Sequence, residues 1–222
     1  MALTLKTSLI AAAFALPMMI ATQAQAGALT YINADPAQQV KVSANGTTHT
    51  TITSGFQINW TADAGDALSS GVYFAVCIEL EQFIANTTYS ASLYSGDTAS
   101  LAKLFEHYGP ASAAPNYSAL QNAAWEIAYE GSGPYDLSSG ILKSQSTGGG
   151  TSVAVAQAYL DSLPGLSVAP NVDWTFYRLA NGNHQDLLVG VRSVNDVPLP
   201  GTALLLGAGL AAIGGLRRRV IR

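Results

Sequence analysis

The chain has 222 residues, of which 49% are hydrophobic and only 11% charged, and its formal net charge is −4. Residues 27–196, which lie between the two terminal segments discussed below, hold five basic and 14 acidic residues and so carry a formal charge of −9. This balance argues against a nucleic-acid partner, because such proteins need a basic surface. The same stretch is long enough for one domain with a substantial core.

The N-terminus has the three parts of a secretory signal peptide. Lys6 is followed by an uncharged apolar run from Thr7 to about Ala21. Ala24-Gln25-Ala26 then fits a small-x-small cleavage site. The sequence therefore predicts a signal peptide over residues 1–26, with its helix, and export of the remainder.

Strand patterns follow the predicted cleavage site. Residues 28–33, 39–44 and 55–60 alternate apolar and polar side chains at period two, with Asp-Pro, Asn-Gly and Thr-rich turns between them. These patterns predict antiparallel strands. Residues 61–71 are expected to form a polar loop, and residues 72–83 a further strand that carries the only cysteine, Cys77.

The hydrophobic period then changes to that of helices. A first helix is expected to start at Asp97 or Thr98 and to stop at Gly109-Pro110, because its apolar residues are spaced i, i+3, i+4, i+7. A second helix has Ser118 as its candidate cap and ends at Gly131. A third is expected over residues 151–163.

Strand patterns return over residues 172–180 and 186–194, joined by Asn-Gly-Asn. The order is strands, helices, strands, without the regular alternation of a doubly wound fold. The fold class predicted is α+β: an antiparallel β-sandwich or barrel with a three-helix insertion, flanked by the N-terminal signal helix and a C-terminal membrane helix.

The C-terminal membrane helix is predicted from residues 201–216, which contain no charge. As a helix this run would span about 24 Å, slightly less than a typical hydrocarbon core. The basic cluster that follows favours the cytoplasmic side of a membrane and acts as a membrane stop; it consists of Arg217, Arg218 and Arg219. The alternative is a buried C-terminal core helix.

This C-terminal layout resembles the PEP-CTERM sorting signal of Gram-negative bacteria. The resemblance rests on a short motif before the apolar helix and on the terminal arginines; the motif is Val197, Pro198, Leu199 and Pro200. Leu199 stands where the commonest form of the motif has Glu. The resemblance implies a sorting domain over residues 197–222, processing by an exosortase, and a protein transiently anchored in the inner membrane before it reaches the envelope or the extracellular space.

Cys77 is unusual because an exported chain with one cysteine cannot form an internal disulfide. One explanation is a silent core residue, since cysteine is among the residue types most often buried. A second explanation comes from the predicted second helix, which contains Gln121, Ala123 and Trp125 in the spacing Gln-x-Ala-x-Trp.

Together with Cys77, this spacing resembles the thioester domain of bacterial surface adhesins. The resemblance implies that residues 27–196 form such a domain and that Cys77 and Gln121 are joined in an internal thioester, with Ala123 and Trp125 supporting the bond. It also implies a partner that bears an amine or hydroxyl group. Leu120 and Val76 depart from the commonest form of the motifs.

Simpler roles for these residues remain open. Ser118-x-x-Gln121 matches a capping box, in which Gln121 would bond back to the backbone at Ser118, and Trp125 could be an ordinary core residue. The three histidines have no metal spacing, and Glu79 and Glu81 are expected on a solvated strand face.

Two functions are therefore expected as alternatives. The first is a cell-surface or biofilm-matrix adhesin that attaches covalently through the thioester. The second is a passive, noncovalent envelope or matrix protein with a packed cysteine. Neither requires a cofactor or a metal, and neither is an enzyme.

Overall fold

The computed structural model describes residues 26–34, 38–113 and 115–195. The predicted signal helix and the predicted membrane helix lie outside these ranges. Within them, no helix combines the length and the apolar character that crossing a bilayer requires.

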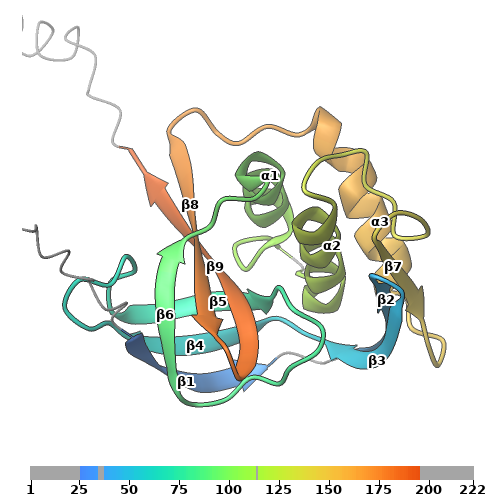
Figure 1. Ribbon diagram of the computed structural model, residues 1–222. Helices are drawn as coiled ribbons and strands as arrows, with labels where there is room; N and C mark the ends of the chain where they lie inside the picture. The colour runs from blue at the N-terminus through green and yellow to red at the C-terminus, as the bar shows by residue number, and fades with distance from the viewer. Residues whose placement is uncertain (1–25, 35–37, 114, 196–222) are drawn as a thin grey trace, which may run out of the picture.

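Six strands form a closed antiparallel barrel, shown on the left of Figure 1. Their order around the barrel is β1-β4-β5-β9-β8-β6, and every neighbouring pair is antiparallel. Closure gives every barrel strand a neighbour on both sides, although β5 pairs with β9 only at Ala75, Val76 and Cys77. The strands are β1 (Ala26–Ala34), β4 (Phe56–Thr61), β5 (Gly71–Cys77), β6 (Thr88–Leu93), β8 (Val172–Asn181) and β9 (His184–Val194).

A second, three-stranded sheet lies beside the barrel in the order β3-β2-β7. Asn45 and Gly46 join its first two strands with positive φ angles of 52° and 84°, values that favour Asn and Gly in a tight hairpin. The strands are β2 (Gln38–Ala44), β3 (Thr47–Thr53) and β7 (Leu142–Ser146).

Three helices pack between and beside these two sheets: α1 (Thr98–Tyr108), α2 (Tyr117–Glu130) and α3 (Ser152–Ser162), the last followed by the short 3-10 turn η1 (Leu163–Gly165). The central helix, α2, contacts β5 of the barrel, β3 and β7 of the small sheet, and both other helices. It is consequently buried on all sides over residues 118–127. The α+β class, the antiparallel barrel and the three helices are as predicted.

Several local predictions were wrong. The strand expected over residues 72–83 ends at Cys77, and the second helix is capped by the Asn116 side chain, which accepts from the Ala119 N–H at 3.0 Å, rather than by Ser118. Strands β3, β6 and β7 were not predicted. The insertion is also not purely helical, because β7 separates α2 from α3.

Both ends of α2 are set by local chemistry. Asn116 satisfies one of the free N–H groups at the start of the helix. At the other end Gly131 adopts a left-handed conformation, with φ of 70°, and its N–H donates to the Ile127 carbonyl. The helix is thereby fixed in position against the end of β5, where the candidate site lies.

Candidate functional site around Cys77 and Gln121

Cys77 and Gln121 are in direct contact although they are 44 positions apart in the sequence. Cys77 is the last residue of β5, and Gln121 lies in the second turn of α2. The Cys77 N–H donates to Gln121 Oε1 at 2.8 Å, and Gln121 Nε2 donates to the Cys77 carbonyl oxygen at 2.7 Å. The Gln121 carboxamide is therefore held against the backbone of Cys77 by two hydrogen bonds.

This contact contradicts the capping role that was the simpler expectation for Gln121. The capping box would require the Gln121 side chain to accept from the backbone at Ser118, but both of its amide groups bond Cys77 instead. The Ser118 hydroxyl donates to the Thr53 carbonyl at 2.6 Å and accepts from the Gln38 N–H at 3.1 Å. Ser118 thus ties α2 to the small sheet and does not cap the helix.

The pair is shielded from water. Gln121 is 1% exposed and Cys77 8% exposed. Burial raises the pKa of the Cys77 thiol far above its ordinary value, because the thiolate would lose its hydration. The thiol is therefore protonated at neutral pH.

The residues predicted to support a thioester line the same helix. Ala123 and Ala124 are fully buried, and Trp125 is 1% exposed. The small alanine side chains let α2 approach its neighbours closely. The Trp125 indole N–H has no hydrogen-bond acceptor within the described ranges.

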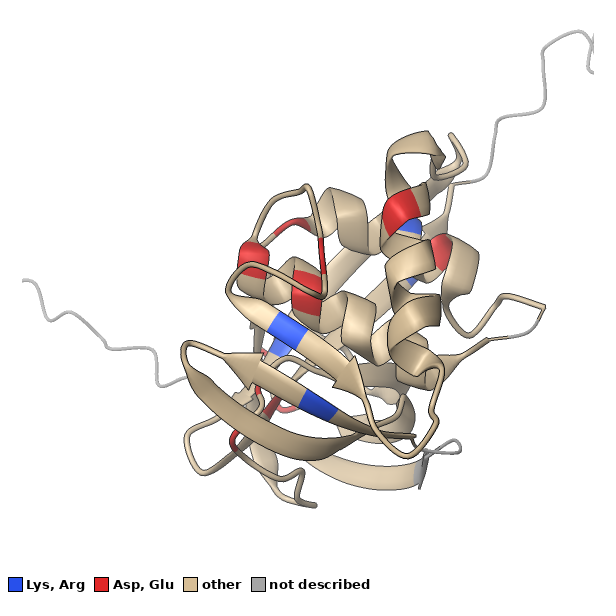
Figure 2. Cartoon of the chain, turned by 90° about the vertical axis from the view of Figure 1, so that its right-hand side faces the viewer, with Lys and Arg blue, Asp and Glu red and all other residues tan. Residues whose placement is uncertain are grey.

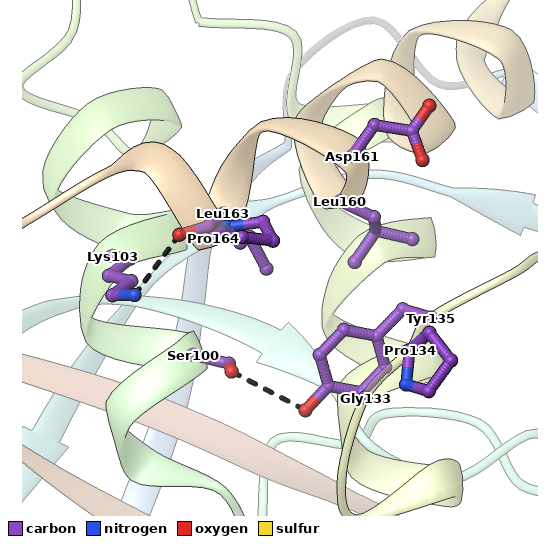
Figure 3. Close-up of a pocket in the computed structure, with 9 residues that line it drawn as sticks. All are labelled: Ser100, Lys103, Gly133, Pro134, Tyr135, Leu160, Asp161, Leu163 and Pro164. Atoms are coloured by element: carbon purple, nitrogen blue, oxygen red, sulfur yellow. Dashed lines mark hydrogen bonds between the residues drawn. The ribbon is translucent and has the colours of Figure 1, made fainter.

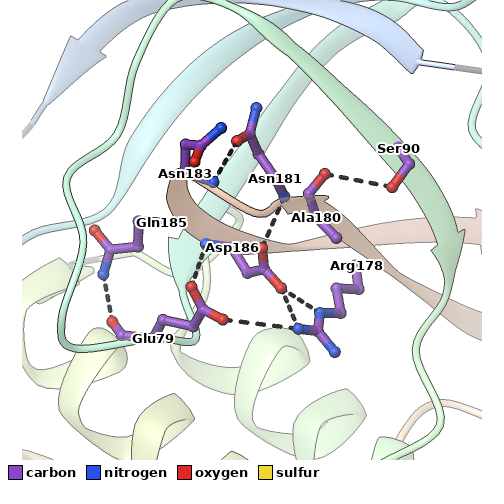
Figure 4. Close-up of polar contacts among 8 residues, drawn as sticks. All are labelled: Glu79, Ser90, Arg178, Ala180, Asn181, Asn183, Gln185 and Asp186. Carbon is purple, nitrogen blue, oxygen red and sulfur yellow. Dashed lines mark hydrogen bonds and ion pairs between the residues drawn. The ribbon is translucent and has the colours of Figure 1, made fainter.

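An ion-pair network fixes the chain just after Cys77 (Figure 4). The Asp186 carboxylate, whose side chain is 3% exposed, bonds the Arg178 guanidinium, and Arg178 also lies 3.7 Å from Glu79. The Asp186 N–H donates to the Glu79 carboxylate at 3.2 Å. The expectation of Glu79 on a solvated strand face was therefore wrong: the residue lies beyond β5 and is tied to β9.

This network was missed in the sequence, although a signal for it exists. The Asn-Gly-Asn turn predicts a hairpin between residues 172–180 and 186–194, and a hairpin brings Arg178 and Asp186 near each other across the two strands. The opposite charges on facing strands could have been noticed from that register.

Among the described residues, one pocket lies away from Cys77 and another opens onto it. One, of about 380 Å³, lies between α1, α3 and the segment before Tyr135 (Figure 3). Its Lys103 ammonium already donates to the Leu163 carbonyl at 3.0 Å, and the Tyr135 hydroxyl bonds Asp97 at 2.5 Å. The other, of about 410 Å³, opens onto Cys77 and is the one that the candidate site shares.

No group of three or more His, Cys, Asp or Glu side chains within the described ranges is arranged to hold a metal ion. His49 lies 4.0 Å from Glu81, and His107 Nε2 lies 3.0 Å from the Ser167 carbonyl oxygen. Figure 2 shows acidic positions on helices and loops and few basic ones.

Comparison with known proteins identifies the C-terminal segment. The PEP-CTERM protein-sorting motif matches residues 196–219. The chain carries a PEP-CTERM sorting motif. The match includes Val197–Pro200 and Arg217–Arg219, so the predicted sorting signal is confirmed, although these residues lie outside the described structure. The motif implies export, exosortase processing and transient membrane anchoring in a Gram-negative bacterium.

The chain is also similar in structure to the N-terminal domain of the Streptococcus pyogenes pilus tip adhesin Cpa. The TM-score is 0.38 and the sequence identity 12%, over 72% of this chain and 96% of that domain. No curated protein matches the sequence.

Proposed function

We propose that this exported protein is a surface or matrix adhesin that forms an internal thioester between Cys77 and Gln121 and attaches covalently to a partner. The observation that carries the proposal is the pair of hydrogen bonds that holds the Gln121 carboxamide on the Cys77 backbone, out of water. Only a cysteine thiol and a glutamine carboxamide supply the two halves of such a bond, and here the carboxamide is held against the backbone of the cysteine.

The two hydrogen bonds bring the residues together, and one of them also favours attack of the Cys77 sulfur on the Gln121 amide carbon. The Cys77 N–H points at Gln121 Oε1, the oxygen on which negative charge develops when sulfur attacks the amide carbon. In the proposed step the Sγ–Cδ bond forms, the Cδ–Nε2 bond breaks, and the thiol proton leaves with nitrogen as ammonia. Burial raises the pKa of the Cys77 thiol, so little thiolate is present and the step is slow. It occurs once per chain, because it consumes the Gln121 carboxamide.

The thioester would then act as an activated acyl group. An amine or hydroxyl on the partner attacks the Gln121 carbonyl carbon, the carbon–sulfur bond breaks, and the nucleophile's proton restores the Cys77 thiol. The protein is consumed as it attaches, so we propose an attachment protein and not an enzyme. The sorting motif supports a location where such a partner is reached, because it implies export.

A noncovalent surface or matrix protein is the second candidate. It is favoured by the fact that both polar groups of the Gln121 amide are already satisfied by Cys77, so the contact also works as a clamp between α2 and β5. In that case Cys77 is a packed thiol.

A tagged amine separates the two candidates. The full chain and its Cys77→Ala variant are incubated with a biotin-linked primary amine and then digested at mildly acidic pH, and the tag is located by mass spectrometry. We expect the tag on Gln121 in the wild type alone, with one new Cys77 thiol for each tag. Absence of the tag, or equal tagging of the variant, would contradict covalent attachment through Cys77 and leave the noncovalent candidate.

A further inference from the structure

The pocket that opens onto Cys77 has an uncharged lining. It lies between strand β3, strands β1 and β4 of the barrel, and the segment that follows β5. Its volume is about 410 Å³. Among the described residues, no Asp, Glu, Lys, Arg or His lines it. The lining instead combines amides, hydroxyls and aromatic or aliphatic groups, including Tyr31, Gln39, Thr50, Ile52, Gln82 and Phe83.

A charged ligand is disfavoured by this lining. A charge that leaves water must find a counter-charge or several strong hydrogen bonds, and the described lining of the pocket offers no ionised side chain. The acidic surplus of residues 27–196 also repels a polyanion at longer range.

A purely apolar ligand is disfavoured as well. Gln82 Oε1 is buried in the pocket wall and has no hydrogen-bond donor within the described ranges. A buried acceptor without a donor costs free energy, and an apolar ligand would leave it in that state. Turning of the Gln82 amide toward the pocket would let a ligand hydroxyl supply the missing donor.

Exposed rings and an aliphatic side chain form the rim. Phe83 is 88% exposed, Ile52 63% and Tyr31 38%. Phe83 therefore contributes little to the core, and its position on the rim of a pocket is typical of a contact surface. Tyr31 is held in place by Phe56, with ring centroids 6.0 Å apart.

The wall that carries Gln82 and Phe83 is fixed before any ligand arrives. The Gln185 N–H donates to the Phe83 carbonyl at 3.2 Å, and the Gln185 side-chain amide donates to the Glu79 carbonyl. Glu79 is in turn held by Arg178 and Asp186 (Figure 4). Such preorganisation lowers the ordering cost of binding.

We propose that this pocket binds a neutral sugar residue of an extracellular polysaccharide, noncovalently. A neutral sugar presents hydroxyl donors and acceptors to the amide and hydroxyl side chains. Its C–H faces carry weak positive charge and are attracted to the negative faces of aromatic rings such as Phe83. This binding is a property of the pocket and does not require the thioester.

The test uses the full chain on an array of immobilised oligosaccharides: neutral hexose, pentose and deoxyhexose oligomers beside uronic-acid and sulfated ones. Three variants are compared. Phe83→Ala removes the rim ring, Gln82→Leu removes the free acceptor, and Leu93→Ala is the matched control, because Leu93 is an exposed apolar residue (65%) outside the pocket.

We expect neutral oligomers to bind and acidic ones not to bind. Affinity should fall about tenfold for Phe83→Ala, the loss typical of one ring contact, and should be unchanged for Leu93→Ala. Bound protein should be released by the free neutral sugar, because the contact is noncovalent, and this release separates the proposal from that of the thioester. Binding of acidic members alone, binding of no neutral member, or wild-type affinity in both Phe83→Ala and Gln82→Leu would overturn the proposal.

Discussion

Replacing Gln121 by glutamate should make the stability of the protein depend on pH in a defined direction. The change is best made in the Cys77→Ala chain, where no thioester can form. A glutamate keeps the acceptor for the residue-77 N–H, but when ionised it has no donor for the residue-77 carbonyl. That buried carbonyl would be left unsatisfied, at a cost of about 1–3 kcal/mol. When protonated, the new carboxyl can donate and restores the pair.

The direction of the pH dependence follows from which protonation state of the introduced Glu the folded state prefers. The folded state favours the neutral acid, so the pKa of the introduced Glu is raised above its unfolded value of about 4.3. Its stabilising contribution is complete below that value and is lost as the pH rises through the folded-state pKa. At neutral pH we expect the double variant to be less stable than Cys77→Ala by about 2 kcal/mol or more.

Urea denaturation of the Cys77→Ala chain and of the double variant, at about pH 4.3 and at neutral pH, measures this difference in stability. All other titrating groups are the same in the two chains, so their contributions cancel. The Cys77→Ala/Gln121→Ala chain is the matched control: it leaves two backbone groups unpaired at every pH, a loss of about 2–6 kcal/mol. A difference between the first two chains that does not change with pH would refute the assigned role of the two hydrogen bonds.

Three further predictions concern the supports of the site. Burial raises the pKa of the buried α2 residue Glu126 to about 7. Its protonated form therefore stabilises the fold below pH 4.5, and this contribution is lost as the pH rises through 7. In urea denaturation, Glu126→Gln should stabilise the protein by about 1–2 kcal/mol above pH 8 and have little effect below pH 4.5. Arg178→Ala leaves the Asp186 carboxylate buried without its partner and should cost about 2–3 kcal/mol by the same assay, whereas a loss under about 0.5 kcal/mol would show that the network is not structural. Asn116→Ala removes the cap of α2 and should cost about 1 kcal/mol, and Asn116→Asp should restore most of it.

The parts of the fold that could be predicted are those in which one periodic pattern dominates. Helix α1 was found with its cap and its stop because its apolar residues follow one face and Gly109-Pro110 ends it. Strands β8 and β9 were found because β-branched and aromatic residues flank a clear turn.

The parts that were missed have weak patterns for physical reasons. Strand β3 consists mostly of threonine, and only one of its seven residues, Thr53, is buried, so its sequence looks like a polar turn. Strand β7 likewise buries only Leu142 and owes its conformation to pairing with β2. Pairing partners distant in sequence do not leave a local signal.

In the candidate site, too, some contacts could be predicted from a sequence pattern and others could not. The sequence spacing around Gln121 led to Cys77 as its partner, and the structure brings these two residues together. The role of Ser118 could not be predicted, because its partners Thr53 and Gln38 belong to a sheet whose position beside α2 is a tertiary feature. A local match to a capping box does not distinguish the two arrangements.

The intact mass of the protein shows whether Cys77 and Gln121 are joined in a thioester. It should be measured for the full chain and for the Cys77→Ala variant, purified cold at mildly acidic pH, before and after treatment with methylamine. With an intact thioester, the wild-type mass is one ammonia below the expected value and rises by one methylamine on treatment. The variant mass is then normal and does not change. A wild-type mass equal to that expected from the sequence, unchanged by methylamine, would contradict the thioester and leave Gln121 as a clamp on Cys77.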